Sequence, residues 1–172
     1  MSSRAVPAPV LLEASNIDTL PGHFIRRLQQ IAVSIFLQEA EAHALTPIQY
    51  AALQTVRRVP DVDQRTLARS VGLDTSTTAG VIDRLEGRGL MQRRVSPEDR
   101  RARLLKLTDD GERLLKEVAP AVLRTQRRIL APLSEADQHD FMRMLEVLVT
   151  ANNELSRAPS DSEMKSPVRY KS

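Results

Sequence analysis

The stretch from Asp74 to Leu107 most constrains the fold of this chain, because a helical pattern there passes directly into two strand-like segments. Asp74 has the kind of side-chain acceptor that begins helices. The apolar residues after it recur at helical spacing, so one face packs inward: Val81, Ile82 and Leu85. Gly87 and Gly89 predict the end of this helix, because glycine tolerates the left-handed conformation common at helix C-termini.

Two short segments follow the helix, and residues 90–95 and 103–107 predict a strand and its return. The residues between them, 96–102, are too polar and too charged to lie in a core, so they predict a loop. A shorter helix is predicted upstream over residues 64–71. Two helices joined by a tight turn, then a strand, a basic loop and a strand, predict a winged helix-turn-helix.

Positive charge is concentrated on the predicted hairpin. Between Arg88 and Lys106, seven Arg and Lys residues minus Glu98 and Asp99 give +5, whereas the whole chain carries +3. Basic side chains also protect sheet edges, so a merely soluble hairpin is the alternative. Directly after a helix that begins with hydroxyl residues, the charge favours a surface that follows nucleic-acid phosphates.

At these residues the sequence resembles the MarR family of winged-helix transcriptional regulators. The matching pieces are Leu85-Glu86 with Gly89-Leu90, Arg93-Arg94 through Asp99-Arg100-Arg101, and Leu107-Thr108-Asp109-Asp110-Gly111. Flanking helices extend the resemblance from about Thr19 to Leu155. The resemblance implies a dimeric operator-binding repressor, often with a small phenolic or aromatic-acid effector. It also implies that Asp99 holds the wing in place and that Arg101 enters the minor groove, where narrow regions concentrate negative potential.

The rest of the chain predicts further helices, so the expected fold is mainly α with a small β-hairpin wing. Thr46 to Gln49 form a capping box with proline at the first helical position. Thr108 and Ser134 cap two later helices, and Pro120 is expected to kink the first of these without ending it. The expected organisation is a flexible arm over 1–17, a dimerisation helix over 18–45, the winged domain over 46–107, C-terminal dimerisation helices over 108–156 and a disordered tail over 157–172.

Apolar stripes on the outer helices exceed what a small winged domain can cover. They include the first long helix, from about residue 19 to His43, and the last helix, whose apolar residues are Phe141, Met144, Leu145, Leu148 and Val149. Burial against a second copy of the chain is the simplest arrangement, and it would also duplicate the DNA-reading helix. The alternative is a monomer whose helices cover their own domain.

The candidate DNA-binding residues come from the helix-turn-helix and the hairpin. Short hydroxyl side chains and a glycine occupy the first turns of the second helix, the part that meets base edges in helix-turn-helix proteins, although they could also only solvate a helix start. Arg84 could meet a phosphate or pair with Asp99. The full set is Arg65, Thr75, Ser76, Thr77, Thr78, Gly80, Arg84, Arg94, Asp99, Arg100, Arg101 and Arg103.

Three residues are candidates for an effector site: His23, Arg26 and Tyr50. Family resemblance places such sites between the dimer helices and the winged domain. Arginine or histidine there could pair with a carboxylate, and tyrosine could donate a hydrogen bond while packing on a ring. A surface arginine and a core tyrosine are an equally good interpretation.

Several classes of site are not indicated. The chain has no cysteine, which excludes disulfides and thiol redox sensing. Its three histidines are far apart and lack metal-ligand spacing, and no motif places a nucleophile or a phosphate-binding loop, so we expect no metal, cofactor or catalytic site. With neither a membrane-length apolar run nor a signal pattern, we expect a cytoplasmic protein and no membrane partner.

These observations predict a ligand-responsive regulator that binds double-stranded DNA as a homodimer, and not an enzyme. The resemblance adds a repressor released from a palindromic operator by a small aromatic acid or phenol, in a family that often controls aromatic-acid degradation. Two alternatives stay open. One is a constitutive architectural DNA-binding protein without an effector, and the other is a winged-helix module used only for protein contacts.

Overall fold

The structure is a computed structural model that describes residues 14–96 and 103–155. The first thirteen residues of the predicted arm and all of the predicted tail over 157–172 lie outside this part of the chain. Three candidate DNA-binding residues of the wing also lie outside it: Asp99, Arg100 and Arg101.

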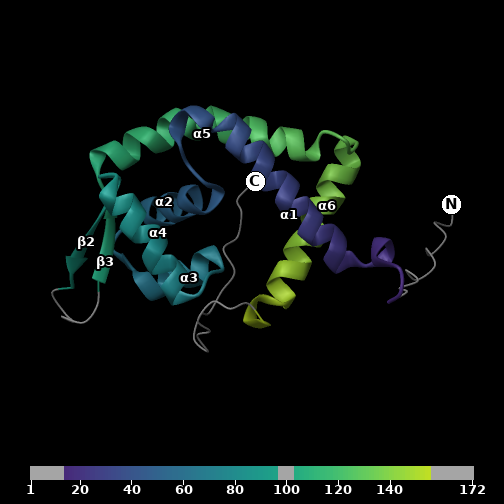
Figure 1. The fold of residues 1–172 in the computed structure, drawn as a ribbon, viewed down its shortest axis with the longest axis horizontal. Coiled ribbons are helices and arrows are strands. Elements are labelled where there is room, and N and C mark those ends of the chain that lie inside the picture. Colours follow the sequence, from purple (N-terminus) through teal and green to yellow (C-terminus); the bar gives the residue numbers. More distant parts are fainter. Residues whose placement is uncertain (1–13, 97–102, 156–172) are drawn as a thin grey trace, which may run out of the picture.

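The described chain is mainly helical, as predicted, with one small sheet (Figure 1). The α-helices are α1 (Pro21–Glu39), α2 (Pro47–Arg58), α3 (Gln64–Val71), α4 (Thr75–Gly87), α5 (Asp109–Leu130) and α6 (Glu135–Ala151). Short 3-10 helices are η1 (Ile17–Thr19), η2 (Glu41–His43) and η3 (Asn153–Leu155). The strands are β1 (Val62–Asp63), β2 (Met91–Val95) and β3 (Arg103–Leu107). Helices α2, α3 and α4 with the sheet form one lobe, and α1, α5 and α6 extend from it.

Side-chain caps begin the helices where the sequence predicts them. Thr46 and Gln49 form the predicted capping box, with the Gln49 amide 3.3 Å from the Thr46 hydroxyl. Asp63, Thr108 and Ser134 each accept a backbone N–H in the first turn of the helix that follows. These oxygens satisfy donors that have no partner within the helix, which explains why the predicted starts agree with the observed ones.

One boundary and one strand differ from the prediction. The first long helix ends at Glu39 and not near His43, because the chain tightens into η2 and Ala44 takes a left-handed conformation with φ 47°. Strand β1 was not predicted, since two residues are too few to show a strand pattern. It pairs antiparallel with β3 in a sheet of order β1-β3-β2, so β3 is central and β2 forms the outer strand of the wing.

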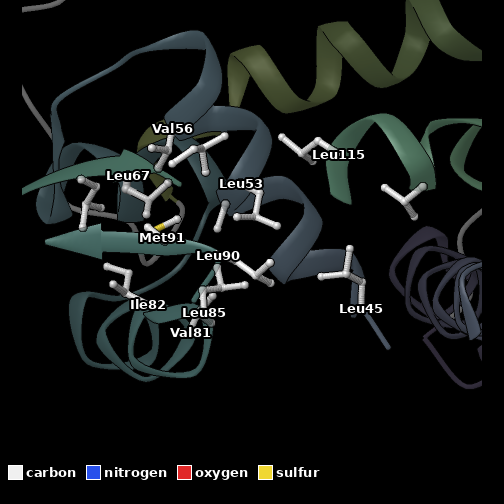
Figure 2. Packing of buried hydrophobic residues seen from close by; sticks show 14 of the residues in the cluster. Leu45, Leu53, Val56, Leu67, Val81, Ile82, Leu85, Leu90, Met91 and Leu115 are labelled. Carbon is white, nitrogen blue, oxygen red and sulfur yellow. The ribbon is translucent and has the colours of Figure 1, made fainter. Parts of the chain in front are cut away.

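One continuous core lies between α2, α3, α4, α5 and the sheet (Figure 2). Leu53, Leu67, Ile82 and Leu85 from three successive helices are all fully buried. Leu115 extends this core into α5, which continues through Pro120 as predicted. The apolar spacing of α4 therefore fixes which of its faces points inward, and the opposite face is left for solvent.

The first turn of α5 lies directly against the start of the wing. The Thr108 hydroxyl donates to the carbonyl oxygen of Gly89 at 2.6 Å, and the Thr108 amide donates to that of Leu90 at 3.3 Å. Gly111 occupies the point of closest approach, and a Cβ atom there would run into the Leu90 carbonyl group. Glycine is therefore required at position 111 for space and not for backbone conformation.

Replacing Gly111 tests this close approach. We expect Gly111→Ala to lower the free energy of unfolding by about 1–3 kcal/mol, because the added methyl group must push two backbone segments apart. Gly22→Ala is the matched control, since Gly22 also lies in the first turn of a helix but has open space around its Cβ position. The control should be neutral or stabilised by up to about 1 kcal/mol. Urea denaturation followed by circular dichroism measures both, and equal stability of the two variants would contradict the packing argument.

Candidate nucleic-acid interface and apolar groove

The N-terminus of α4 presents its hydroxyl side chains unequally. The Asp74 carboxylate accepts from the Thr77 amide at 2.8 Å and from the Thr77 hydroxyl at 2.7 Å. These hydrogen bonds from Thr77 hold the pKa of Asp74 below its ordinary value. Thr75 and Ser76 are exposed beside this cap. Thr77 is exposed as well, but its hydroxyl donates to Asp74 within the helix start.

The prediction that Thr78 contacts DNA is wrong. Its side chain is 1% exposed, and its hydroxyl donates to the Asp74 carbonyl oxygen at 2.9 Å. Thr78 falls on the inward face of α4 together with Val81 and Leu85, and a satisfied, buried hydroxyl has no path to a base edge. Gly80 is half-buried, with open space at its Cβ position, so it does permit close approach of another surface.

Arg93 joins the wing to α4, a role that the sequence analysis missed. Its guanidinium lies 2.6 Å from both Asp83 and Glu86, and its backbone amide donates to the other Glu86 oxygen at 2.7 Å. One carboxylate thus holds the start of the wing by side chain and backbone together. The pairing depends on how β2 folds back on α4, which the spacing of residues alone does not reveal.

Arg94 is also engaged within the protein. Its guanidinium forms an ion pair with Asp61 at 2.5 Å, although the arginine side chain stays 51% exposed. Asp61 precedes β1 in a left-handed conformation with φ 63°, which aspartate tolerates better than most residues. Its other carboxylate oxygen is buried without a hydrogen-bond partner among the described residues. Arg94 therefore connects the outer strand β2 to the turn that precedes β1.

Arg88, counted among the basic residues of the hairpin, makes a third internal contact. It follows α4 as its C-cap and donates to the backbone carbonyl oxygens of His43 and Ala44 at 3.1 and 2.7 Å. Three cations of the hairpin region thus have structural partners. Among the candidate residues, Arg65 at the start of α3, Arg84 on α4 and Arg103 on β3 have exposed side chains on the same lobe.

The three candidate effector residues do not form one pocket within a single chain. Tyr50 packs its ring against Phe36 with centroids 5.9 Å apart, and its hydroxyl accepts from Gln54 at 2.8 Å. His23 lies thirteen residues before Phe36 on the same helix, a separation of about 20 Å at the usual helical rise. His23 is close to Asp18 at 4.0 Å, and exposed Arg26 donates to Gln30 at 3.3 Å.

An apolar groove of about 690 Å³ runs between α1 and α6. Its lining includes Phe24, Leu28, Ile31, Phe141, Leu145 and Leu148. Helix α6 has no buried residue at all, and Leu148 is 53% exposed. A helix with this many uncovered apolar side chains exceeds the scattered exposure normal for a monomer.

The described residues offer little else in the way of a chemical site. Within residues 14–96 and 103–155, no cluster of His, Cys, Asp or Glu could hold a metal ion. None of the described helices is both long and apolar enough to cross a membrane.

Comparison with known proteins gives a consistent result. The model of the MarR family matches residues 45–102, the segment from before α2 to the wing. Among curated relatives, the HTH-type transcriptional repressor NicR of Pseudomonas putida is 27% identical over 154 residues, which is 88% of this chain and 98% of NicR.

Solved structures agree with the sequence comparison. The transcriptional regulator PcaV of Streptomyces coelicolor, in complex with its natural ligand, superposes with a TM-score of 0.72 at 36% identity, covering 81% of this chain and 99% of PcaV. The repressor CouR bound to a 23-mer DNA duplex superposes with a TM-score of 0.74 at 29% identity. The match covers 81% of this chain and 99% of CouR. BpsR of Bordetella bronchiseptica superposes with a TM-score of 0.70 at 30% identity, and the match covers 74% of this chain and 96% of BpsR. The DNA binding of BpsR is regulated by 6-hydroxynicotinic acid.

Proposed function

Because the chain belongs to the MarR family of transcriptional regulators, we propose that it is a ligand-responsive repressor that binds a palindromic operator as a homodimer. The observation that carries the proposal is the construction of α4. Its apolar face is locked into the core, and its capped N-terminus leaves Thr75 and Ser76 exposed beside a basic lobe. An α-helix presented in this way fits the major groove, where base edges carry distinct donor and acceptor patterns.

We assign the candidate contacts to two roles. Thr75, Ser76 and Gly80 are proposed to approach base edges, while Arg65, Arg84 and Arg103 are proposed to meet phosphates. Thr77 is proposed to support the DNA-binding surface by capping α4. Arg94 is proposed to contact DNA only after its ion pair with Asp61 has opened. The proposed roles of Asp99 in holding the wing and of Arg101 in the minor groove come from the family resemblance, and that of Arg100 comes from the positive charge of the loop.

The proposed dimer uses the groove between α1 and α6. Two copies related by a twofold axis would cover each other's apolar helices and would set two α4 helices on one face of the DNA. The burial pattern supports this: the core of the winged helix continues into α1 and α5, whereas no residue of α6 is part of it.

The proposed effector is a small aromatic or pyridine carboxylic acid. BpsR supports this class, since its DNA binding is regulated by 6-hydroxynicotinic acid. On this chain the exposed guanidinium of Arg26 would neutralise the carboxylate, with His23 one turn away on α1. Arg26 lies ten residues before Phe36 on α1, about 15 Å from the ring partner of Tyr50, so Tyr50 is proposed to join the site only across the dimer. The alternative is a constitutive DNA-binding protein without an effector, and ligand titration distinguishes it from the proposed ligand-responsive repressor.

Two substitutions separate base reading from phosphate contact. Operators are first selected from random DNA duplexes, and binding is then measured by fluorescence anisotropy across a salt series. Ser76→Ala should relax base preference with the salt slope unchanged, and Arg65→Ala should weaken all sequences alike and reduce the slope by about one. Thr78→Val is the control, because it removes a hydroxyl that is buried. Its base preference should match that of the parent. An unchanged salt slope in Arg65→Ala together with unchanged base preference in Ser76→Ala would remove α3 and α4 from the DNA interface. If no DNA sequence is selected at all, the result favours a protein-interaction module.

Dimerisation is tested by a charge in the groove. Leu148→Asp should give monomer or aggregate in sedimentation velocity, because an unpaired carboxylate would be buried between apolar helices. Val59→Asp is the control, since Val59 is also exposed, at 43%, but lies after α2 in the winged domain. The control should sediment as the parent does. A stable dimer of Leu148→Asp would place the interface elsewhere.

The effector proposal is tested by calorimetric titration with 6-hydroxynicotinic acid and benzoic acid. Arg26→Ala should weaken acid binding by at least about tenfold, since hydrogen bonds to charged groups contribute roughly 1.5–3 kcal/mol. Operator affinity should be nearly unchanged. Arg113→Ala removes an exposed arginine of α5 that pairs with Asp110, and it should leave both affinities intact. Unaltered acid affinity in Arg26→Ala removes that residue from the site, and no binding of either acid by the parent favours the constitutive alternative.

A further inference from the structure

We infer that Arg88 is a positioning residue that sets the distance between the two α4 helices of the dimer. The inference rests on the proposed dimer and adds to it a specific element of control. It assigns to a side chain that touches no DNA a part in choosing the spacing of operator half-sites.

The side chain of Arg88 contacts two residues that lie 44 and 45 positions earlier in the chain, Ala44 and His43. Its two terminal guanidinium nitrogens donate separately to the carbonyl oxygens of Ala44 at 2.7 Å and of His43 at 3.1 Å. These carbonyls end η2, where the helix leaves acceptors without partners, and Ala44 turns in a left-handed conformation. A planar guanidinium meets two neighbouring acceptors at once, which a single ammonium group does poorly.

The other end of this connection is fixed to the long helices. Glu39, the last residue of α1, receives hydrogen bonds from Arg124 at 2.7 Å and from Arg128 at 2.9 Å, both on α5. Hydrogen bonds from Arg124 and Arg128 hold the pKa of Glu39 below its ordinary value. Residues 40–45 therefore lie between a helix pair tied together by ion pairs and the winged domain.

A small rotation at this junction has a large effect at the far end of α4. The helix has 13 residues and begins with the exposed hydroxyl residues, while Arg88 follows its last turn. Its length is about 20 Å, so a rotation of about 10° about the Arg88 end moves the N-terminus by about 3.5 Å. This shift is close to the rise of one base pair, roughly 3.4 Å. A contact that limits rotation at Arg88 therefore limits which half-site spacing two copies of α4 can fit.

Spin labels on α4 test the inference directly. The chain has no cysteine, so Ser76→Cys supplies one label on each copy of the full-length protein. Pulsed dipolar spectroscopy then measures the distance between the two labels in the dimer. The variants are Arg88→Met, which removes the donors, and Arg88→Lys, which keeps the charge without the planar fork. Arg58→Met is the control, because Arg58 also lies at the end of a helix of this domain, as an exposed residue.

We expect one narrow distance distribution in the labelled parent and in Arg58→Met. Arg88→Met should shift or broaden the distribution by at least about 3 Å, the displacement of a rotation of about 10°, and Arg88→Lys should lie between the two. Operators selected by Arg88→Met should show a wider range of half-site spacings. An unchanged distribution in Arg88→Lys and in folded Arg88→Met overturns this inference alone. Absence of dipolar coupling in the labelled parent overturns the dimer, and this inference with it.

Discussion

The contact between the first turn of α5 and the chain at Leu90 determines how the two halves of the molecule are joined. At this point the end of α4, the start of β2 and the start of α5 meet through backbone carbonyls and one threonine hydroxyl. Only a residue without a Cβ fits at position 111. Because α5 leaves the winged domain here, this packing helps to set the direction of α5, and it leaves no room for a side chain at position 111.

The sequence predicted the local parts of the fold well, because each depended on neighbouring residues. Asp63, Thr46 and Thr108 cap helices through atoms within three residues of themselves, so their pattern is visible in the chain. The contacts that were missed join distant segments. Arg93 with Glu86, Arg94 with Asp61 and Arg88 with Ala44 all depend on how the hairpin and η2 return to α4. Counting cations along the sequence therefore overstated the charge that is free for a nucleic acid.

The error at Thr78 shows the same limit on a smaller scale. Four consecutive hydroxyl residues, Thr75 to Thr78, look alike in the sequence, but a helix turns each one by about 100° from the last. The fourth thus falls on the face of Val81 and Leu85 and enters the core. Of the candidate effector residues, Tyr50 packs on Phe36 and its hydroxyl accepts from Gln54, so its described contacts are those of a core tyrosine and its part in an effector site stays a prediction.

The uncovered face of α6 has a consequence for how the protein responds to its own abundance. No residue of α6 is fully buried within its own chain, so with the proposed second copy in place, part of the stability of α6 comes from assembly. Occupancy of an operator by the dimer then rises with the square of the monomer concentration at low expression. A modest drop in synthesis would thereby clear the DNA more sharply than a single binding constant suggests, giving the regulator a concentration threshold that no residue of α4 encodes.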